Sequence, residues 1–439
     1  MDALELLPAG PVRARLRAPA SKSVTNRALL CAALADGTSL LRDPLDSDDS
    51  QAMRAALTAL GAGIQAGPVD GIPVWRVCGT AGRLAVPAAP LELDARTSGT
   101  TMRFLTAVAT LVPPGAGAGP AVTVTGRPGL LARPIGPLVA ALRALGAAIT
   151  DQNGYPPVTA VGGGLDGGQV TLNAAASSQF ASAVLLAAPY ARRPVELRVT
   201  SLGAPAYVAL TAQVMRDFGA AVIHGEGVWR VEARPYQARE VAVEYDASAA
   251  AHLFAVAAAT GGEVTVTNAP AGSWQPDAQL PALLEAMGCT VRRDGAALTV
   301  CGPERLDPVD ADLAAMPDQV TTVAVLAALA HGRSRLRGVA VARGHETDRL
   351  AALATELGKL GAEVTELPDG LVIDSREPRG PARIDPHDDH RLAMAFAALA
   401  ARVPGVTIEQ PGCVAKTYPG FWDDLARAGV HFRRERGPA

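Results

Sequence analysis

The sequence predicts an α/β protein made of six repeats, and three observations lead to this prediction. An apolar helical run followed by glycine, a small residue and a β-branched or aromatic residue occurs six times, with the glycines 68 to 85 residues apart. A polar cluster opens an alanine-rich helix once in each repeat. Strand-like runs follow both kinds of helix. Six copies at such spacing indicate a repeat architecture.

The first helix type ends at a glycine in each repeat. These glycines are Gly61, Gly146, Gly219, Gly288, Gly361 and Gly429. A glycine after the last apolar turn commonly takes the left-handed conformation that caps a helix. We therefore expect each of them to end a helix and to lead into a strand.

The second helix type opens at a serine or an aspartate. The opening residues are Ser21, Ser98, Ser177, Asp246, Asp318 and Asp388. Such residues cap helices, and helix N-termini also attract anions. Capping alone does not explain the cations that stand nearby, such as Lys22, Arg103 and Arg391. The helices lead to strand-like runs at residues 37–41, 262–266 and 405–408, which gives a βαβ-type order.

Length and composition exclude several classes of protein. A chain of 439 residues is long enough for two or more domains. A net charge of −3 and a pI near 6.2 argue against nucleic acid or an anionic membrane as the main partner. Apolar runs such as residues 393–401 are too short to cross a bilayer, and residues 1–5 do not resemble a secretory signal. Five cysteines without a CxxC pair suit a reducing compartment. We expect a cytoplasmic protein without a zinc site.

Lysine is rare in this chain, with three residues against 37 arginines. Lys22 and Lys416 stand in polar clusters, where a compact ammonium can approach a single atom. Lys359 lies near the end of a predicted helix, where a cation meets the helix dipole, and we interpret it as structural. Codon bias is the alternative explanation for the three lysines.

Seven motifs in order resemble the family of EPSP synthases (3-phosphoshikimate 1-carboxyvinyltransferases). They are residues 21–30, 98–103, 133–136, 177–180, 345–350, 389–391 and 415–417. The resemblance implies the two-domain enolpyruvyl transferase fold, an inside-out α/β barrel with six βαβαββ repeats, three in each domain. It places residues 1–18 and 242–439 in a discontinuous domain with most of the acid–base residues and those that bind phosphoenolpyruvate (PEP). Residues 19–241 form the domain with most of the shikimate 3-phosphate residues, and the active site lies in the cleft between the domains.

The resemblance implies a reaction of the shikimate pathway to chorismate and the aromatic amino acids. The family transfers the enolpyruvyl group of PEP to the 5-hydroxyl of shikimate 3-phosphate through a tetrahedral intermediate and releases phosphate. Its partners are these two small molecules. Several cations must hold two phosphates and two carboxylates, and no metal or other cofactor is needed if arginine and lysine neutralise that charge. We expect a monomer.

The resemblance assigns substrate-binding residues position by position. Those expected to bind shikimate 3-phosphate are Lys22, Ser23, Arg27, Ser177, Ser178, Gln179, Ser201, Asp318 and His345. Those expected to bind PEP are Lys22, Gly99, Arg133, Gln179, Arg349, Arg391 and Lys416.

Three residues are the candidates for catalysis. Asp318 is expected to accept the proton of the 5-hydroxyl. Glu346 is expected to deliver a proton to C3 of PEP, and Lys22 is the alternative donor. Nearby cations favour a carboxylate as a base over a carboxylic acid, so the sequence leaves the donor open. His345 stands where the family often has lysine, and we expect it to titrate near neutrality.

Two other functions are possible on the same fold. The sister family that acts on a UDP-amino sugar carries a loop cysteine, but residues 126–134 contain none. A non-catalytic phospholigand-binding protein would not need both acids and Lys22. A metal site at His387 and His390 is disfavoured because Arg391 would repel the ion.

The chain departs from the family pattern at several positions. Thr97 replaces the usual asparagine, Phe104 stands where many bacterial members have proline, and the stretch after Ser201 differs. In this family glyphosate competes with PEP. We expect Gly99 to preserve that sensitivity, with Phe104 displacing its helix and weakening it.

Overall fold

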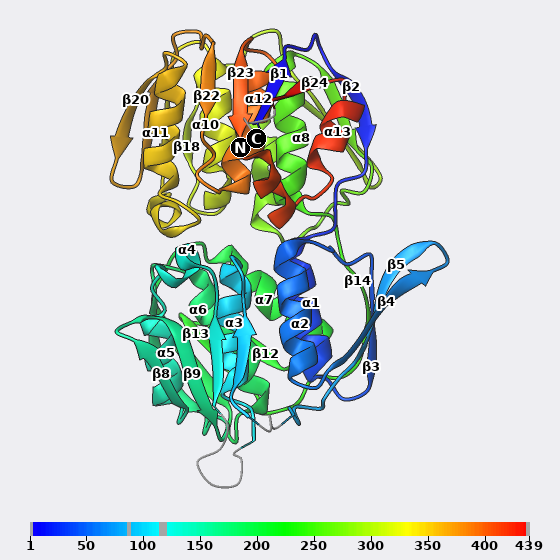
Figure 1. The fold of residues 1–439 in the computed structure, drawn as a ribbon, viewed down its shortest axis with the longest axis vertical. Helices are drawn as coiled ribbons and strands as arrows, with labels where there is room; N and C mark the ends of the chain where they lie inside the picture. Colours follow the sequence, from blue (N-terminus) through cyan, green and yellow to red (C-terminus); the bar gives the residue numbers. More distant parts are fainter. Residues whose placement is uncertain (1–2, 86–88, 114–120, 436–439) are drawn as a thin grey trace. The chain divides into compact units, whose positions relative to one another are not determined.

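The computed structural model describes residues 3–85, 89–113 and 121–435 (Figure 1). The chain divides into two compact units. Unit 1 consists of Met1–Pro19 and Tyr245–Ala439, and unit 2 is Ala20–Glu244. The boundaries expected from the sequence, after residues 18 and 241, differ from these by one and three residues. Which unit serves which substrate stays a prediction.

The described strands of unit 2 form three four-stranded sheets. In spatial order the first contains β14 (Glu240–Ala242), β3 (Thr38–Arg42), β5 (Ile72–Cys78) and β4 (Gly63–Val69). The second contains β6 (Leu91–Asp94), β7 (Val122–Thr125), β9 (Tyr155–Gly162) and β8 (Ala148–Gln152). The third contains β10 (Gly168–Ala174), β11 (Val195–Leu202), β13 (Val228–Val231) and β12 (Val222–Gly225).

The described strands of unit 1 repeat this arrangement. The first sheet contains β2 (Arg13–Leu16), β15 (Glu263–Val266), β17 (Ala297–Cys301) and β16 (Thr290–Asp294). The second contains β18 (Asp310–Asp312), β19 (Arg333–Arg337), β21 (Gly370–Asp374) and β20 (Glu363–Leu367). The third contains β22 (Ala382–Ile384), β23 (Val406–Glu409), β1 (Ala3–Leu7) and β24 (His431–Glu435).

All six sheets share one pairing pattern. The first two strands are parallel, as in β10 and β11, where Gly168 faces Val195. The remaining pairs are antiparallel, as in β11 and β13, where Val195 faces Val231. A parallel pair needs a crossover helix, whereas an antiparallel pair needs only a turn. The pattern is that of a βαβαββ unit, so the predicted α/β fold of six repeats is confirmed.

Three sheets contain a strand from a distant part of the chain. β2 lies beside β15, with Arg13 opposite Glu263. β14 lies beside β3, with Glu240 opposite Leu40. β1 lies between β23 and β24, where Leu6 faces both Val406 and Phe432. Each unit is therefore closed by strands that are far apart in the sequence.

Buried helices form the core of each unit. They are α1 (Lys22–Leu34), α3 (Gly99–Ala109) and α6 (Ser178–Ala187) in unit 2, and α8 (Ala247–Thr260), α10 (Val320–Leu329) and α12 (His390–Ala400) in unit 1. In unit 1 these three helices pack on one another (Figure 1). Their alanines are almost all fully buried, and such small side chains allow close packing. These are the helices that the sequence predicted to open at polar clusters.

The helices of the first type cover the sheets. They are α2 (Asp48–Ala59), α5 (Gly136–Ala144), α7 (Ala206–Asp217), α9 (Leu280–Ala286), α11 (Arg349–Lys359) and α13 (Phe421–Arg427). Each is followed by one of the six repeat glycines, which have φ between 82° and 102°. The predicted left-handed helix ends are confirmed at all six positions.

Short helices complete the connections. They are α4 (Pro128–Leu131) and the 3-10 helices η1 (Ala188–Tyr190), η2 (Pro276–Gln279), η3 (Pro317–Gln319), η4 (Ala340–Gly344) and η5 (Pro411–Lys416). Two predicted helix starts are wrong by a residue. The cap of α10 is Gln319, and Asp318 lies before it in η3. The cap of α12 is Asp389, whereas Asp388 has a φ of 56° in the preceding turn. None of the described helices has both the length and the apolar character that a membrane span needs.

Candidate active site

Arg349 forms hydrogen bonds with a cluster of acids in unit 1. It is the first residue of α11, after the cap Asp348, and is 1% exposed. Its guanidinium donates to Asp318 Oδ1 at 2.8 Å, Glu346 Oε2 at 2.9 Å and Asp389 Oδ2 at 2.7 Å. One buried cation therefore holds three carboxylates that come from three separate segments.

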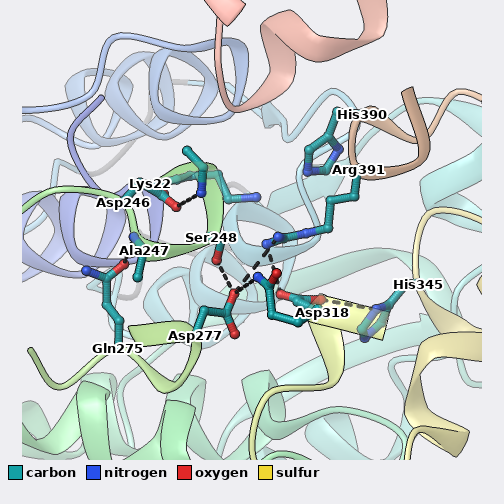
Figure 2. A network of polar contacts seen from close by, with 12 residues as sticks. Lys22, Asp246, Ala247, Ser248, Gln275, Asp277, Asp318, His345, His390 and Arg391 are labelled. Carbon is teal, nitrogen blue, oxygen red and sulfur yellow. Dashed lines mark hydrogen bonds and ion pairs between the residues drawn. The ribbon is translucent and has the colours of Figure 1, made fainter. Parts of the chain in front are cut away.

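Two further predicted cations contact the same acids. Arg391, in the first turn of α12, donates from Nη2 to Asp318 Oδ2 at 3.0 Å (Figure 2). Lys416, at the end of η5, donates from Nζ to Glu346 Oε1 at 2.7 Å. The cap Asp389 accepts the backbone N–H of Arg391 at 2.8 Å and so fixes the start of this helix. The structure thus brings together all the predicted site residues of unit 1, including His345, whose Nδ1 lies 3.4 Å from Asp318 Oδ1.

The charge state of Asp318 follows from these contacts. Burial by itself would raise the pKa of Asp318, but the charges of Arg391 and Arg349 outweigh it and hold the pKa below its usual value. Asp318 is therefore an ionised carboxylate at neutral pH. Glu346 contacts a cation through each oxygen, Arg349 through Oε2 and Lys416 through Oε1.

His345 differs from the sequence prediction in its charge. Its Nδ1 lies 2.8 Å from Arg349 Nη1. Because arginine can only donate, Nδ1 must be the acceptor and the proton must sit on Nε2. Burial and Arg349 lower the pKa of His345 to about 4. The expected titration near neutrality is therefore wrong, and His345 is a neutral hydrogen-bond donor at pH 7.

Lys22 begins the polar cluster of unit 2. Ser21 caps α1 by accepting the backbone N–H of Val24 at 3.3 Å. Lys22 Nζ lies 3.2 Å from Asp49 Oδ2, and Asp49 on α2 is only 2% exposed. Sequence reasoning missed Asp49, although Asp46, Asp48 and Asp49 form a visible acidic cluster in the sequence. The second oxygen of Asp49 is buried without a hydrogen-bond partner among the described residues.

Arg27 is held from several sides within unit 2. It donates from Nε to Thr211 Oγ1 at 2.7 Å and from Nη1 to the carbonyl of Ser23 at 2.9 Å. Its guanidinium carbon lies 5.2 Å from the ring centroid of Phe104, a cation–π arrangement. Burial lowers the pKa of Arg27 to about 10, so the side chain keeps its charge at neutral pH. The sequence-divergent Phe104 therefore packs against a predicted substrate residue.

Two predicted PEP residues of unit 2, Arg133 and Gln179, lie beside a third, Gly99. A Cβ atom there would lie 2.6 Å from Arg103 Nη1, 3.4 Å from Arg133 Nη1 and 3.5 Å from Gln179 Oε1. Gln179 also donates to Thr100 Oγ1 at 3.4 Å. Glycine leaves this spot open beside two guanidinium groups at the start of α3, which suits an anion.

The four serines predicted in unit 2 have different surroundings. Ser23 lies in the first turn of α1, and its carbonyl accepts from Arg27. Ser177 caps α6 by accepting the backbone N–H of Gln179 at 3.2 Å, and Ser178 is the first residue of that helix. Ser201 is exposed near the end of β11. The predicted site residues of unit 2 thus gather mainly at the starts of α1, α3 and α6.

The histidines near Arg391 have other partners than a metal. His387 Nε2 lies 3.2 Å from the buried Glu356, and the ring of His390 is buried beside Asp389. In residues 3–85, 89–113 and 121–435 no three His, Cys, Asp or Glu side chains are placed to hold a metal ion.

Comparison with known proteins gives a match over nearly the whole chain. The family described as EPSP synthase (3-phosphoshikimate 1-carboxyvinyltransferase) matches residues 7–425. A 3-phosphoshikimate 1-carboxyvinyltransferase of Methanosphaerula palustris is 44% identical over 425 residues, covering 96% of this chain and 98% of the relative. The protein of that name from Nostoc punctiforme is 39% identical over 429 residues, with the same coverage of 96% and 98%.

Solved structures agree with this match. An EPSP synthase from Acinetobacter baumannii superposes with a TM-score of 0.82 at 26% identity, covering 99% of this chain and 100% of that chain. The enolpyruvyl transferase NikO from Streptomyces tendae has a TM-score of 0.78 at 18% identity, covering 100% of this chain and 99% of that chain. The second likeness concerns the fold alone.

Proposed function

Because the chain belongs to the EPSP synthase family, it transfers the enolpyruvyl group of PEP to the 5-hydroxyl of shikimate 3-phosphate, and we propose that the two polar clusters perform this transfer. The products are 5-enolpyruvylshikimate 3-phosphate and phosphate. The observation that carries the site assignment is the Arg349 network, in which one guanidinium holds both Asp318 and Glu346.

PEP would compete with the acids for the same cations. Arg349, Arg391 and Lys416 now donate to Asp318 and Glu346. The carboxylate and phosphate of PEP need such donors. As PEP takes them, each acid loses a partner that stabilised its ionised form, so its affinity for a proton rises. PEP binding would thereby prepare Asp318 as a base and allow Glu346 to carry a proton.

The addition step then follows. Asp318 takes the proton of the 5-hydroxyl while that oxygen bonds to C2 of PEP. C3 receives a proton from Glu346, with Lys22 as the alternative donor, which gives the tetrahedral intermediate. In the elimination step C3 returns a proton to the residue that donated it, and the bond from C2 to the phosphate oxygen breaks. The ammonium of Lys22 would stabilise the charge on the departing phosphate.

The remaining residues would orient the two substrates. Ser23, Arg27 and the start of α6 (Ser177, Ser178 and Gln179), together with Ser201, are proposed to hold shikimate 3-phosphate. Neutral His345 would donate from Nε2 to a hydroxyl of its ring. The open spot at Gly99, beside Arg133 and Gln179, is proposed to hold an end of PEP.

A direct assay tests the function. The protein mixed with shikimate 3-phosphate and PEP should release phosphate and form 5-enolpyruvylshikimate 3-phosphate. A parallel reaction with PEP and a UDP-amino sugar should release none. Release only in the second reaction would overturn the assignment.

Phe104→Leu should weaken the binding of one substrate only. The leucine removes the aromatic face beside Arg27, an interaction worth about 0.5–2 kcal/mol. We expect the KM for shikimate 3-phosphate to rise roughly two- to tenfold, with the KM for PEP within about twofold of wild type. Phe218→Leu is the matched control, because Phe218 is equally buried in unit 2 and packs on Tyr236 instead. Equal effects of the two variants on both KM values would contradict the role of Phe104.

Three further properties belong to the proposal. We propose a cytoplasmic protein, which the five free cysteines support. We also propose that it acts as a monomer, which light scattering during chromatography would test. We also propose that glyphosate inhibits the enzyme, because position 99 is a glycine without a side chain beside Arg133 and Gln179.

A further inference from the structure

A buried acid that the mechanism above does not use lies beside Asp318. Asp277 belongs to η2 in unit 1 and is 2% exposed. The preceding Gln275 fixes this segment to the start of α8. Its side chain donates to the carbonyl of Tyr245 at 2.6 Å and accepts the backbone N–H of Ala247 at 3.1 Å. Asp277 is therefore anchored, and nothing in the sequence around it had indicated a functional role.

Three groups lie around one oxygen of Asp277, and two of them, Ser248 and Arg391, are labelled in Figure 2. The hydroxyl of Ser248 on α8 and the Nε2 of Gln319 on η3 both donate to Oδ2, the second at 2.8 Å. Arg391 Nη1 lies 4.0 Å from the same oxygen. The other oxygen, Oδ1, is buried with no hydrogen-bond partner in the described part of the chain.

Asp277 is linked to Asp318 through two residues, Gln319 and Arg391. Gln319 is the residue that follows Asp318, so its bond to Asp277 restrains the segment that carries Asp318. Arg391 stands between the two acids, 3.0 Å from Asp318 and 4.0 Å from Asp277. A third carboxylate, Asp389, caps the helix that carries this arginine.

The charges of the two acids oppose each other. Burial and the charge of Asp318 raise the pKa of Asp277. Such coupling is reciprocal, so the charge of Asp277 also raises the proton affinity of Asp318. The other charged or titratable groups around Asp318 are Arg349, Arg391, His345 and Glu346. Without the negative charge of Asp277, the two arginines would lower the pKa of Asp318 further.

We propose that Asp277 is a positioning residue for the base: it shares Arg391 with Asp318 and holds Gln319, and so keeps Asp318 oriented and able to accept a proton. The inference rests on the proposed role of Asp318. A purely structural role, in which Asp277 only ties η2 to η3, is the alternative.

Asp277→Asn tests the proposal through the pH dependence of kcat. The amide keeps the shape and can still accept from Ser248 and Gln319, but it removes the charge. A nearby like charge shifts a titration by about one pH unit, and a base weakened by that amount loses roughly three- to tenfold in rate. We expect the acid limb of the kcat profile to shift to lower pH by about one unit. The plateau value of kcat should be roughly three- to tenfold lower.

Ser248→Ala provides a second, milder variant. It keeps the charge of Asp277 but removes a donor that favours the ionised form. We expect kcat within about twofold of wild type at alkaline pH, falling to the Asp277→Asn values as the pH is lowered.

Asp424→Asn is the matched control for the loss of a buried carboxylate. Asp424 is also buried in unit 1, where it accepts from the hydroxyl of Tyr418 at 2.6 Å and pairs with Arg427. This variant should leave the acid limb in place. An unshifted limb in Asp277→Asn, or an equal shift in the control, would overturn the proposal.

Asp318→Asn distinguishes the role of Asp318 as the base from the positioning role of Asp277. Near-wild-type kcat in this variant would refute Asp318 as the base, and the inference with it. If Asp318→Asn is nearly inactive while Asp277→Asn matches wild type, only the positioning role fails. In the double variant we expect Asp277→Asn to add little further loss, because its effect acts through Asp318.

Discussion

Lys22→Arg should lower kcat at least about 100-fold, although the positive charge is retained. The ammonium of Lys22 lies 3.2 Å from the nearly buried Asp49. A planar guanidinium on a differently shaped side chain cannot place one nitrogen at the same point while also fitting beside α2. Steady-state phosphate release from PEP and shikimate 3-phosphate measures the effect.

Lys359→Arg is the matched control for this variant. Lys359 donates to Glu356 Oε2 at 2.6 Å and to the carbonyl of Arg383 at 3.1 Å, and its side chain is 39% exposed. An arginine can make equivalent contacts there, so kcat should stay within about twofold of wild type. If Lys22→Arg also keeps its kcat within about threefold, the scarcity of lysine has no catalytic meaning.

Arg349→Met should lower the free energy of unfolding by about 3–5 kcal/mol at pH 7. The guanidinium is 1% exposed and donates to Asp318, Glu346 and Asp389. Methionine fills much of the space but leaves these carboxylates without their shared cation. Urea unfolding of both proteins measures the difference.

The size of this loss should depend on pH. In the folded protein Arg391 and Arg349 hold the pKa of Asp318 below its usual value, so the stability that Asp318 contributes is present above about pH 4 and is lost as the pH falls. The gap between wild type and Arg349→Met should therefore narrow as the pH falls from about 5 toward 3. A gap that stays constant over this range would contradict the ion-pair account.

Arg383→Met serves as the control for Arg349→Met. Arg383 pairs with Glu409 at 2.9 Å and Glu435 at 2.7 Å, but its side chain is 54% exposed. Exposed pairs contribute at most about 1 kcal/mol, so this variant should lose no more than that.

The repeat architecture could be predicted because its signals are local. A helix end at Gly61 or Gly219 depends on a few neighbouring residues, and each glycine has the expected positive φ. The start of α12 was placed one residue early because Asp388 and Asp389 are both good caps in isolation. The turn geometry that chooses between them depends on the surrounding fold.

The strands that complete the sheets could not be placed from such signals. β1 pairs with β23, and their partners Leu6 and Val406 are 400 positions apart in the sequence. Nothing in the pattern of residues 3–7 distinguishes an N-terminal strand of the first repeat from the third strand of the last sheet. The family resemblance placed residues 1–18 in one domain with residues 242–439, but it did not give the position of β1 between β23 and β24.

Parts of the site could not be predicted from the sequence for the same reason. Asp49 contacts Lys22 and Asp277 lies near Arg391, and these pairs come together only by tertiary packing. The charge state of His345 was wrongly predicted because it depends on burial and on a guanidinium 2.8 Å away. Sequence motifs identify residue types, whereas proton affinities depend on the folded surroundings.

The place of β1 between β23 and β24 has a consequence for synthesis on the ribosome. Unit 2 is one continuous stretch, and its last strand, β14, is made directly after the rest of the unit. Unit 1 needs β24, which ends at Glu435, before its third sheet can close around β1. At 5–20 residues per second, roughly 200 further residues take about 10–40 s. During this interval β1 has been synthesised but its partners β23 and β24 have not, and unit 2 can fold first.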